Sequence, residues 1–323
     1  MTGVQTCALP IFVPGIRVRL ELHVAHDEAR ANGANPEIHL RFHDILLSGL
    51  QLGLINSAWL GTAVDTARGI QLTKEIGFDT IDIFADPLEI SPQERRLIRK
   101  TCTASNLPVV AVVCCALGIA DFNKPVRDFH VLRAKRYLDL GHELEARNML
   151  LVLGEYIWQQ EVISAADQWK WAVEHVRDLA EYAKGLGLEL AIELEPFALS
   201  LINNIDRMSR FLADVDYPAA RANVDISHLA LVHDSADQIS RLAGRIAHVH
   251  LSDCDGKKHG DLPPGRGTVQ FPPYLKALAA SGFDGAVSIE LEYSPEPGKI
   301  VDWVREAYQS TDKLMRALGL RGQ

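Results

Sequence analysis

The stretch ELAIELEPF at residues 189–197 decides the fold, together with NVDISH at 223–228, HVHLSDCDG at 248–256 and VSIELEYSP at 287–295. Each stretch is a short apolar run that ends in carboxylates or histidines. Short apolar runs separated by longer amphipathic stretches are typical of parallel strands joined by helices. The strands of such a sheet point the same way, so we expect their polar ends to meet on one face.

The same alternation continues through the chain from Leu50. Ser91 and Pro92 begin one helix with a cap and a first-turn proline, and another runs from near Ala165 to Gly185. Eight strands are predicted, at residues 50–56, 80–84, 109–115, 148–153, 189–194, 222–225, 247–251 and 285–291. Eight strands alternating with eight helices predict an α/β protein with one closed (β/α)₈ barrel over residues 49–323. An open doubly wound sheet is the alternative.

Residues 1–48 do not share this pattern. They contain four histidines without a clear period, for which a metal-binding tail is one interpretation. The apolar stretch from Cys7 to Val13 is interrupted by Pro10 and lacks the basic region of a signal peptide. We expect an irregular N-terminal extension, in part non-native or disordered, outside the single barrel domain.

Composition narrows the classes of function. The 323 residues are 47% hydrophobic and 23% charged, as in an ordinary globular protein. The net charge of −9 argues against nucleic acid, whose phosphates need a basic surface, and favours a small-molecule partner. The five cysteines include no CxxC pair, so we expect a reducing cytoplasm and no disulfide framework. The sequence has no apolar run of about 18 residues, so no membrane span is predicted.

Four polar residues close apolar strands: Glu193, Asp225, His250 and Glu290. Polar groups at such positions are costly to bury unless they serve a ligand or each other. Three carboxylates and one imidazole form an oxygen-rich set that suits one divalent ion, Mn²⁺, Mg²⁺ or Co²⁺. Ion pairs lining the barrel without a metal are the alternative, which the lack of lysine and arginine at these strand ends disfavours.

Periodicity leaves one choice open in each of two strands. Glu195 has the same parity as Glu193, and Glu292 has the same parity as Glu290. The earlier glutamate of each pair is preferred, because it directly follows the apolar run. Glu195 precedes a proline, so we expect it to face substrate or solvent.

Further residues near the strand ends are candidates for substrate binding or for support of a ligand. His248 is expected to contact substrate or to pack deeper in the barrel, and Asp253 to orient a ligand histidine. Arg266 lies between two glycines of the loop after the seventh strand, where it contacts a substrate oxygen or stays solvated. The candidates for substrate binding are His228, His248, Arg266, Glu155 and Glu195.

These motifs resemble those of a known family. LAIE at 190–193, NVDISH, HVHLSD followed by PPGRG at 263–267, and GFDGAVSIE at 282–290 resemble the xylose-isomerase-like TIM-barrel superfamily of sugar isomerases and epimerases. The resemblance covers residues 50–318. The family's metal ligands on strands five to eight, carried onto this sequence, are Glu193, Asp225, His250 and Glu290. The epimerases have an asparagine-arginine segment after the first glutamate, whereas this chain has Leu-Glu-Pro-Phe, so the resemblance does not select the sugar.

The resemblance implies a metal-dependent isomerase or epimerase that acts on a ketose or keto-sugar, and a homo-oligomer. Glu193 and Glu290 would move protons on opposite faces of one carbon, while the ion stabilises an enediolate. The alternative is a lyase, a dehydratase or keto-glycoside or C-glycoside eliminase, with His248 or His228 as the acid. A nuclease acting on abasic DNA is disfavoured by the acidic charge, and a non-enzymatic subunit by the intact ligand set.

Overall fold

The computed structural model describes residues 12–13, 16–17, 49–154, 163–292 and 294–322. Contacts between Cα atoms divide the chain into residues 1–49 with Gly322 and residues 50–321 with Gln323. In the first unit, Phe12–Val13 (β1) pairs antiparallel with Ile16–Arg17 (β2). The other residues of the expected N-terminal extension lie outside the described part of the chain, so its expected disorder stays a prediction.

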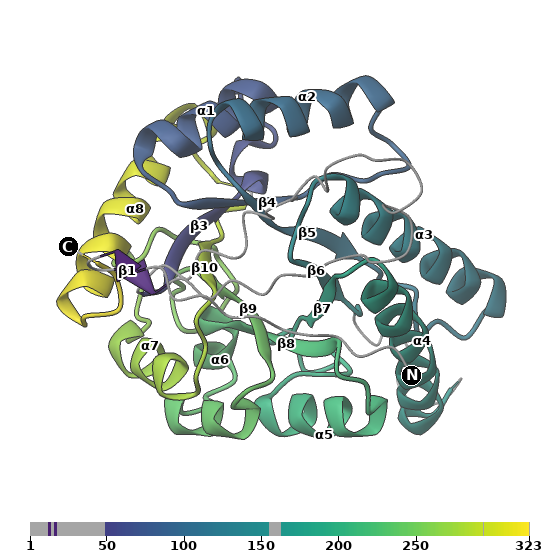
Figure 1. Cartoon of the computed structure of the whole chain (residues 1–323). Helices are drawn as coiled ribbons and strands as arrows, with labels where there is room; N and C mark the ends of the chain where they lie inside the picture. The colour runs from purple at the N-terminus through teal and green to yellow at the C-terminus, as the bar shows by residue number, and fades with distance from the viewer. Residues whose placement is uncertain (1–11, 14–15, 18–48, 155–162, 293, 323) are drawn as a thin grey trace. The chain divides into compact units, whose positions relative to one another are not determined.

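The second unit contains a closed barrel of eight parallel strands, seen in Figure 1 as the central ring. Each strand pairs with the next along the chain, and the last closes the ring on the first. Closure confirms the predicted (β/α)₈ barrel and excludes the open sheet. The strands are Gln51–Ile55 (β3), Thr80–Ile83 (β4), Val109–Cys115 (β5), Asn148–Val152 (β6), Glu189–Ile192 (β7), Ala220–Asp225 (β8), Ile246–Leu251 (β9) and Ala286–Ile289 (β10).

Helices surround the barrel (Figure 1). The predicted cap at Ser91 is confirmed, because its hydroxyl accepts the backbone N–H of Glu94 at 3.1 Å. No helix in the described ranges is long and apolar enough to cross a membrane. The α-helices are Thr66–Ile76 (α1), Pro92–Ala104 (α2), Lys124–Glu143 (α3), Ala165–Gly185 (α4), Ile205–Val215 (α5), Ile226–Leu231 (α6), Phe271–Ala280 (α7) and Ile300–Ala317 (α8), with 3₁₀ turns at Asn56–Trp59, Ala236–Leu242 and Pro297–Lys299.

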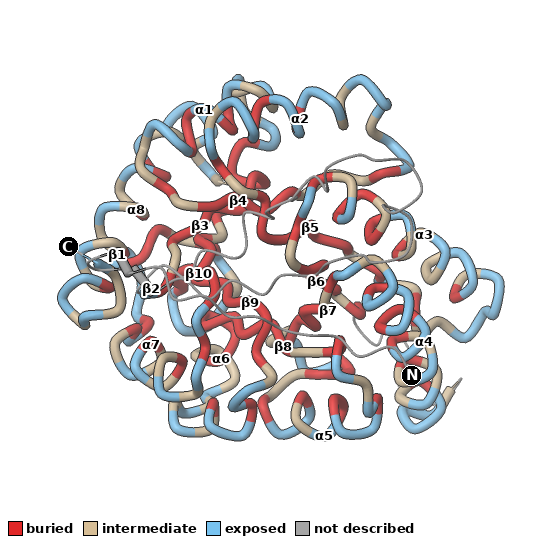
Figure 2. The backbone as a smooth tube through the Cα atoms, viewed as in Figure 1, coloured by how far each residue is buried: buried red, intermediate tan, exposed pale blue. Residues whose placement is uncertain are grey.

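The strands carry two apolar clusters on opposite faces. The larger cluster packs strands against helices and includes Leu54 and Leu151. Ile55, Val113 and Leu150 form a separate, smaller cluster. Because side chains alternate along a strand, this second cluster faces the barrel interior. In Figure 2 most of the strand residues in the ring are buried. The apolar inner cluster therefore lies on β3, β5 and β6, and leaves the inner face of β7–β10 to other residues.

Candidate metal centre

The four predicted ligands lie at the carboxyl ends of four successive strands. Glu193 directly follows β7 and Glu290 directly follows β10. Each still donates its backbone N–H to the neighbouring strand, Glu193 to Leu151 at 3.0 Å and Glu290 to Leu251 at 3.1 Å. Asp225 ends β8 and pairs in register with His250 of β9. The barrel thus holds all four backbones at the same rim.

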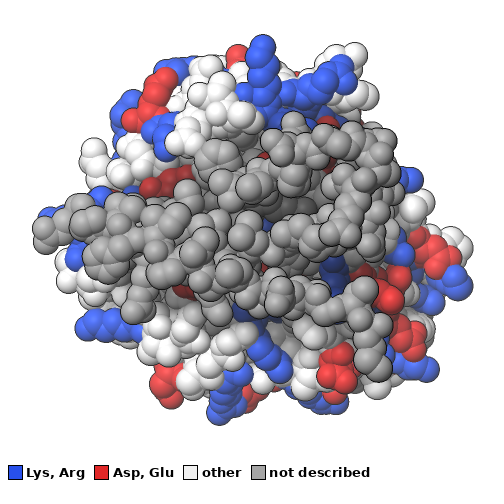
Figure 3. Space-filling model, in the orientation of Figure 1, with Lys and Arg blue, Asp and Glu red and all other residues white. Residues whose placement is uncertain are grey.

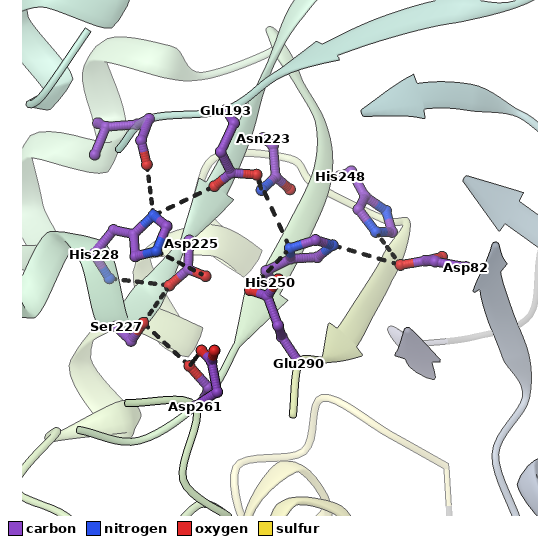
Figure 4. Close-up of polar contacts among 12 residues, drawn as sticks. Asp82, Glu193, Asn223, Asp225, Ser227, His228, His248, His250, Asp261 and Glu290 are labelled. Atoms are coloured by element: carbon purple, nitrogen blue, oxygen red, sulfur yellow. Dashed lines mark hydrogen bonds and ion pairs between the residues drawn. The ribbon is translucent and has the colours of Figure 1, made fainter. Parts of the chain in front are cut away.

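The four side chains converge, as Figure 4 shows. His250 Nδ1 lies 3.3 Å from Glu290 Oε2 and 3.9 Å from Glu193 Oε2. Ligand atoms of Asp225, His250 and Glu290 all lie within 4.8 Å of one another, and so do those of Glu193, Asp225 and His228. The two groups share Asp225. The structure therefore brings the predicted residues into one cluster and adds His228 to it.

Two carboxylates of the cluster keep one oxygen without a hydrogen-bond partner. Glu193 Oε2 accepts the side-chain amide of Asn223 at 2.5 Å, whereas Oε1 has no such partner. Asp225 Oδ1 accepts the Ser227 hydroxyl at 2.8 Å and the His228 backbone N–H at 3.0 Å, and Oδ2 accepts none. Glu193 is 4% exposed and Asp225 is fully buried. Carboxylate oxygens buried in this way fit ligands of a cation.

The electrostatics of the cluster also favour a cation. In the described part of the chain, only histidines lie within ion-pair distance of Glu193, Asp225 and Glu290. Burial lowers the pKa of His250, but Glu290, Asp82 and Glu193 outweigh burial and raise that pKa well above its ordinary value. The carboxylates therefore attract positive charge, and three oxygens with one imidazole nitrogen suit a divalent ion.

The later glutamates of the two strands lie outside this cluster. Glu195 and Glu292 are both partly exposed. Burial and, after it, the charges of Glu292, Glu195 and Glu290 raise the pKa of the Cys115 thiol to about 12. Both glutamates are therefore close enough to act electrostatically at the barrel rim. Among the residues whose ligand atoms lie close enough together to share an ion, however, are Glu193 and Glu290, the earlier glutamate of each pair.

Of the predicted substrate residues, His228 lies beside the cluster. Its Nδ1 donates to the Leu194 carbonyl at 2.6 Å, and its Nε2 lies 3.8 Å from Asp225 Oδ2. The His228 ring also lies 4.7 Å, centroid to centroid, from that of His259. His228 Nε2 has no hydrogen-bond partner, so it remains able to contact a ligand.

The other candidates for substrate binding have different surroundings. His248 is fully buried and donates from Nε2 to Asp82 at 2.7 Å, so it packs deeper in the barrel, which is one of the two positions expected for it. Arg266 pairs with Glu306 and stacks over Trp303, so its guanidinium contacts α8, and its contact with a substrate stays a prediction. Glu155 lies outside the described residues.

Asp253 does not orient a histidine as expected. Its two carboxylate oxygens accept backbone N–H groups at 2.8–3.0 Å, from Cys254, Gly265, Gly267 and Val269. These four bonds occupy both oxygens and shape the loop after β9, because peptide N–H groups bind a buried carboxylate well.

Four residues near the cluster were missed from the sequence: Asp82, Asn223, His259 and Asp261. Asp261 is 4% exposed, and its Oδ1 lies 3.2 Å from Ser252 Oγ and 3.3 Å from His259 Nε2. His259, Asp261 and Glu290 also offer ligand atoms within 4.8 Å of one another. Two of the four had a signal in the sequence: Asp82 is an acid inside the apolar run TIDIF, and Asn223 is a polar residue inside the strand segment ANVD.

A closed barrel with a cluster of acids and histidines at its carboxyl rim is an architecture shared by many metalloenzymes. The family model described as xylose isomerase-like TIM barrel matches residues 70–314, and the chain belongs to this family.

The relatives include an epimerase and a dehydratase. A D-psicose 3-epimerase of Ruminiclostridium cellulolyticum is 27% identical over 228 residues, which cover 68% of this chain and 76% of the epimerase. An inosose dehydratase of Mesomycoplasma hyopneumoniae is 22% identical, over 81% of this chain and 95% of the dehydratase. The solved structure of the IOLI protein with a bound zinc atom matches at a TM-score of 0.73 and 16% identity, over 83% of this chain and 99% of that one.

Proposed function

We propose that this protein is a divalent-metal-dependent sugar epimerase or isomerase that acts on a ketose or keto-sugar. The observation that carries the proposal is the placement of two carboxylates around one imidazole. Glu193 follows β7 and Glu290 follows β10, with β8 and β9 lying between these strands, and both carboxylates lie within ion-pair distance of His250 Nδ1. Epimerisation needs two proton-transfer groups that approach one carbon from different sides.

Glu193, Asp225, His250 and Glu290 would hold the ion, which we propose is Mn²⁺, Mg²⁺ or Co²⁺. A bound ion of this kind polarises a carbonyl and stabilises the negative charge of an enediolate. Glu193 Oε1 and Asp225 Oδ2 support this assignment, because both lie buried at the rim without a hydrogen-bond partner.

The proton transfers fall to the two glutamates. Asn223 holds Glu193 in one orientation, which suits a base that removes a proton from a defined position. Glu290 lies 3.3 Å from His250 and would return the proton on the other face of that carbon. In the reverse reaction the two residues exchange roles. His228 would accept or donate a hydrogen bond at Nε2 to a substrate hydroxyl.

The relationship to D-psicose 3-epimerase supports a ketose as the substrate class. The residues after Glu193 are Leu-Glu-Pro-Phe, where the epimerases that the sequence resembles have asparagine and arginine. The side chains that follow the first glutamate therefore differ from those of the epimerases. We expect the protein to prefer a sugar other than the simplest ketoses.

The test is solvent isotope exchange. The protein loaded with Mn²⁺, Mg²⁺ or Co²⁺ is incubated in D₂O with a panel of ketoses, inososes and 3-keto-glycosides, and the products are analysed by NMR and mass spectrometry. We expect one deuterium at one carbon and an isomer of unchanged composition. Absence of exchange across the panel, with metal binding verified, would contradict the proposal.

A lyase is the second candidate, and one buried residue favours it. Burial, with the charges of Asp225 and Glu292, raises the pKa of Asp261 to about 8, so this carboxyl is mostly protonated at neutral pH. Asp261 and Glu290 offer oxygen atoms within 4.8 Å of each other, so Asp261 is placed to protonate a leaving group. An inosose dehydratase is among the relatives. Loss of water or of an aglycone in the same assay would select the lyase.

A further inference from the structure

Beneath the candidate metal centre, one carboxylate contacts two histidines. Asp82 lies on β4, across the barrel from the metal ligands, between Ile81 and Ile83, which belong to the outer apolar cluster. Alternation along the strand therefore turns Asp82 inward. It is fully buried, and its Oδ2 lies 2.7 Å from His248 Nε2 and 3.6 Å from His250 Nε2 (Figure 4).

The two ring nitrogens of His250 face different partners. Nδ1 faces the carboxylates of Glu290 and Glu193, where the cation would lie, and Nε2 faces Asp82. A neutral imidazole carries its proton on one nitrogen and offers a lone pair on the other. A carboxylate next to Nε2 favours the proton there and leaves the Nδ1 lone pair for a metal.

Asp82 is suited to this task because its own position is fixed. His248 comes from the layer below His250 on the same strand and donates to Asp82 Oδ2. Asp82 Oδ1 has no hydrogen-bond partner, so the carboxylate retains capacity to accept a second N–H. His250 Nε2 forms no hydrogen bond and lies 3.6 Å from Asp82 Oδ2, its ion-pair contact on that side of the ring.

We propose that Asp82 is a positioning residue: held by His248, it fixes His250 with Nε2 protonated and Nδ1 presented to the metal. This inference rests on the proposed function only in assuming that a divalent ion binds at the cluster, and it does not depend on the identity of the sugar or the reaction.

The experiment compares Asp82→Asn with Thr80→Val. Thr80 lies two residues earlier on the same inward face, is fully buried, and its hydroxyl has no hydrogen-bond partner. The dissociation constant of Mn²⁺ is measured by calorimetry on the metal-free proteins, alongside their thermal unfolding without metal. We expect Asp82→Asn to weaken Mn²⁺ binding about 10- to 100-fold, and Thr80→Val to leave it close to wild type.

Equal Mn²⁺ affinity in Asp82→Asn and wild type would overturn the inference, while Mn²⁺ binding by wild type would still support the proposed metal centre. An equal loss of affinity in Thr80→Val would also overturn it, since general loosening of the barrel would then be sufficient. If Asp82→Asn does not fold, ¹⁵N NMR of histidines in the Zn²⁺-loaded wild type shows which ring nitrogen of His250 binds the metal. Zinc at His250 Nδ1 with a proton on Nε2 supports the inference, and zinc at Nε2 refutes it.

Discussion

At the scale of single residues, two glutamates that look equivalent in the sequence have different surroundings. Glu193 is 4% exposed and is held by the amide of Asn223. Glu290 is more open, with a side chain 14% exposed, and its ion-pair contact is with His250 at 3.3 Å. The amide therefore holds Glu193 in one orientation, whereas Glu290 contacts the imidazole of a ligand candidate.

Replacing either glutamate should therefore abolish most of the turnover. We expect Glu193→Gln and Glu290→Gln each to lower kcat by about 10²- to 10⁴-fold at saturating metal, because each removes a proton-transfer group. Steady-state kinetics on the best substrate of the isotope screen measures this. Glu306→Gln on α8, whose partner is Arg266, is the matched control. A kcat within a factor of two or so of wild type in either site variant would rule out its catalytic role.

At the scale of elements, the strand ends and the segments after them are built as units. Asp225 ends β8, and the same side chain caps α6 by accepting the His228 N–H. One oxygen thus starts the helix while the other faces the cluster. After β9, Asp253 gathers four N–H groups of the following loop, and this loop also carries His259 and Asp261 to the site.

The loop should loosen when Asp253 is removed. Asp253→Ala leaves four backbone N–H groups without their acceptor, each at a cost of about 1–3 kcal/mol when buried. We expect amide hydrogen exchange in residues 265–269 to become at least about tenfold faster, with the barrel strands little changed. Asp255→Ala is the control, because Asp255 accepts only two exposed N–H groups at the loop tip. Unchanged protection of residues 265–269 would contradict this account.

The strand pairing around Gly53 should also be sensitive to size. Gly53 pairs with Ser288 on one side and Thr80 on the other, and a Cβ added to it would lie 2.6 Å from Thr80 Oγ1 and even closer to Ser288 Oγ. We expect Gly53→Ala to destabilise the barrel by about 1–3 kcal/mol. Adding Ser288→Ala should restore part of this loss in urea unfolding. A double variant as unstable as the sum of the two single variants would refute the steric explanation.

At the scale of the whole molecule, the protein has an acidic net charge of −9, and its surface and its interior hold charged side chains in different ways. On the face shown in Figure 3, basic and acidic side chains are interspersed around the described surface. Among the described residues, the buried carboxylates at the barrel rim instead have only histidines within ion-pair distance, and no lysine or arginine. A cation there should stabilise the whole barrel, since it binds the folded state alone.

Metal should therefore raise the melting temperature. An ion at 100 times its Kd adds about 2.7 kcal/mol, which corresponds to roughly 5–10 °C for a domain of this size. Differential scanning calorimetry with and without excess Mn²⁺ measures the gain, and chelator should reverse it. A melting temperature that does not respond to Mn²⁺, Mg²⁺ or Co²⁺ would count against a metal centre.

The same gain should depend on pH in a defined direction. The pKa of His250 is raised in the fold, so its stabilising effect on the metal-free protein is present below its unfolded value of about 6.5 and is lost as pH rises through the folded value. A metal needs the neutral imidazole, so it competes with this proton. We expect the Mn²⁺-induced gain in melting temperature to increase between about pH 6 and pH 8. A gain that shrinks over this interval would contradict the assignment of His250.

Much of the fold could be predicted because its signals are local. The eight strands are short apolar runs, and the cap at Ser91 sits within four residues of the group that it binds. The ligand candidates could also be named, since a carboxylate that ends an apolar strand is unusual wherever it occurs. Asp253 was misjudged because its partners come from a loop whose path back to the strand no periodicity predicts.

By itself the sequence determined the alternation of strands and helices and the polar character of the strand ends, because both depend on neighbours along the chain. Only the tertiary structure decided depth within the barrel. His248 and His250 share one parity and one strand, yet the first is buried against Asp82 and the second reaches the rim cluster. Closure and register set that difference by bringing inward-facing side chains of β4 and β9 together inside the barrel, and the two residues that meet there are 166 residues apart in the chain.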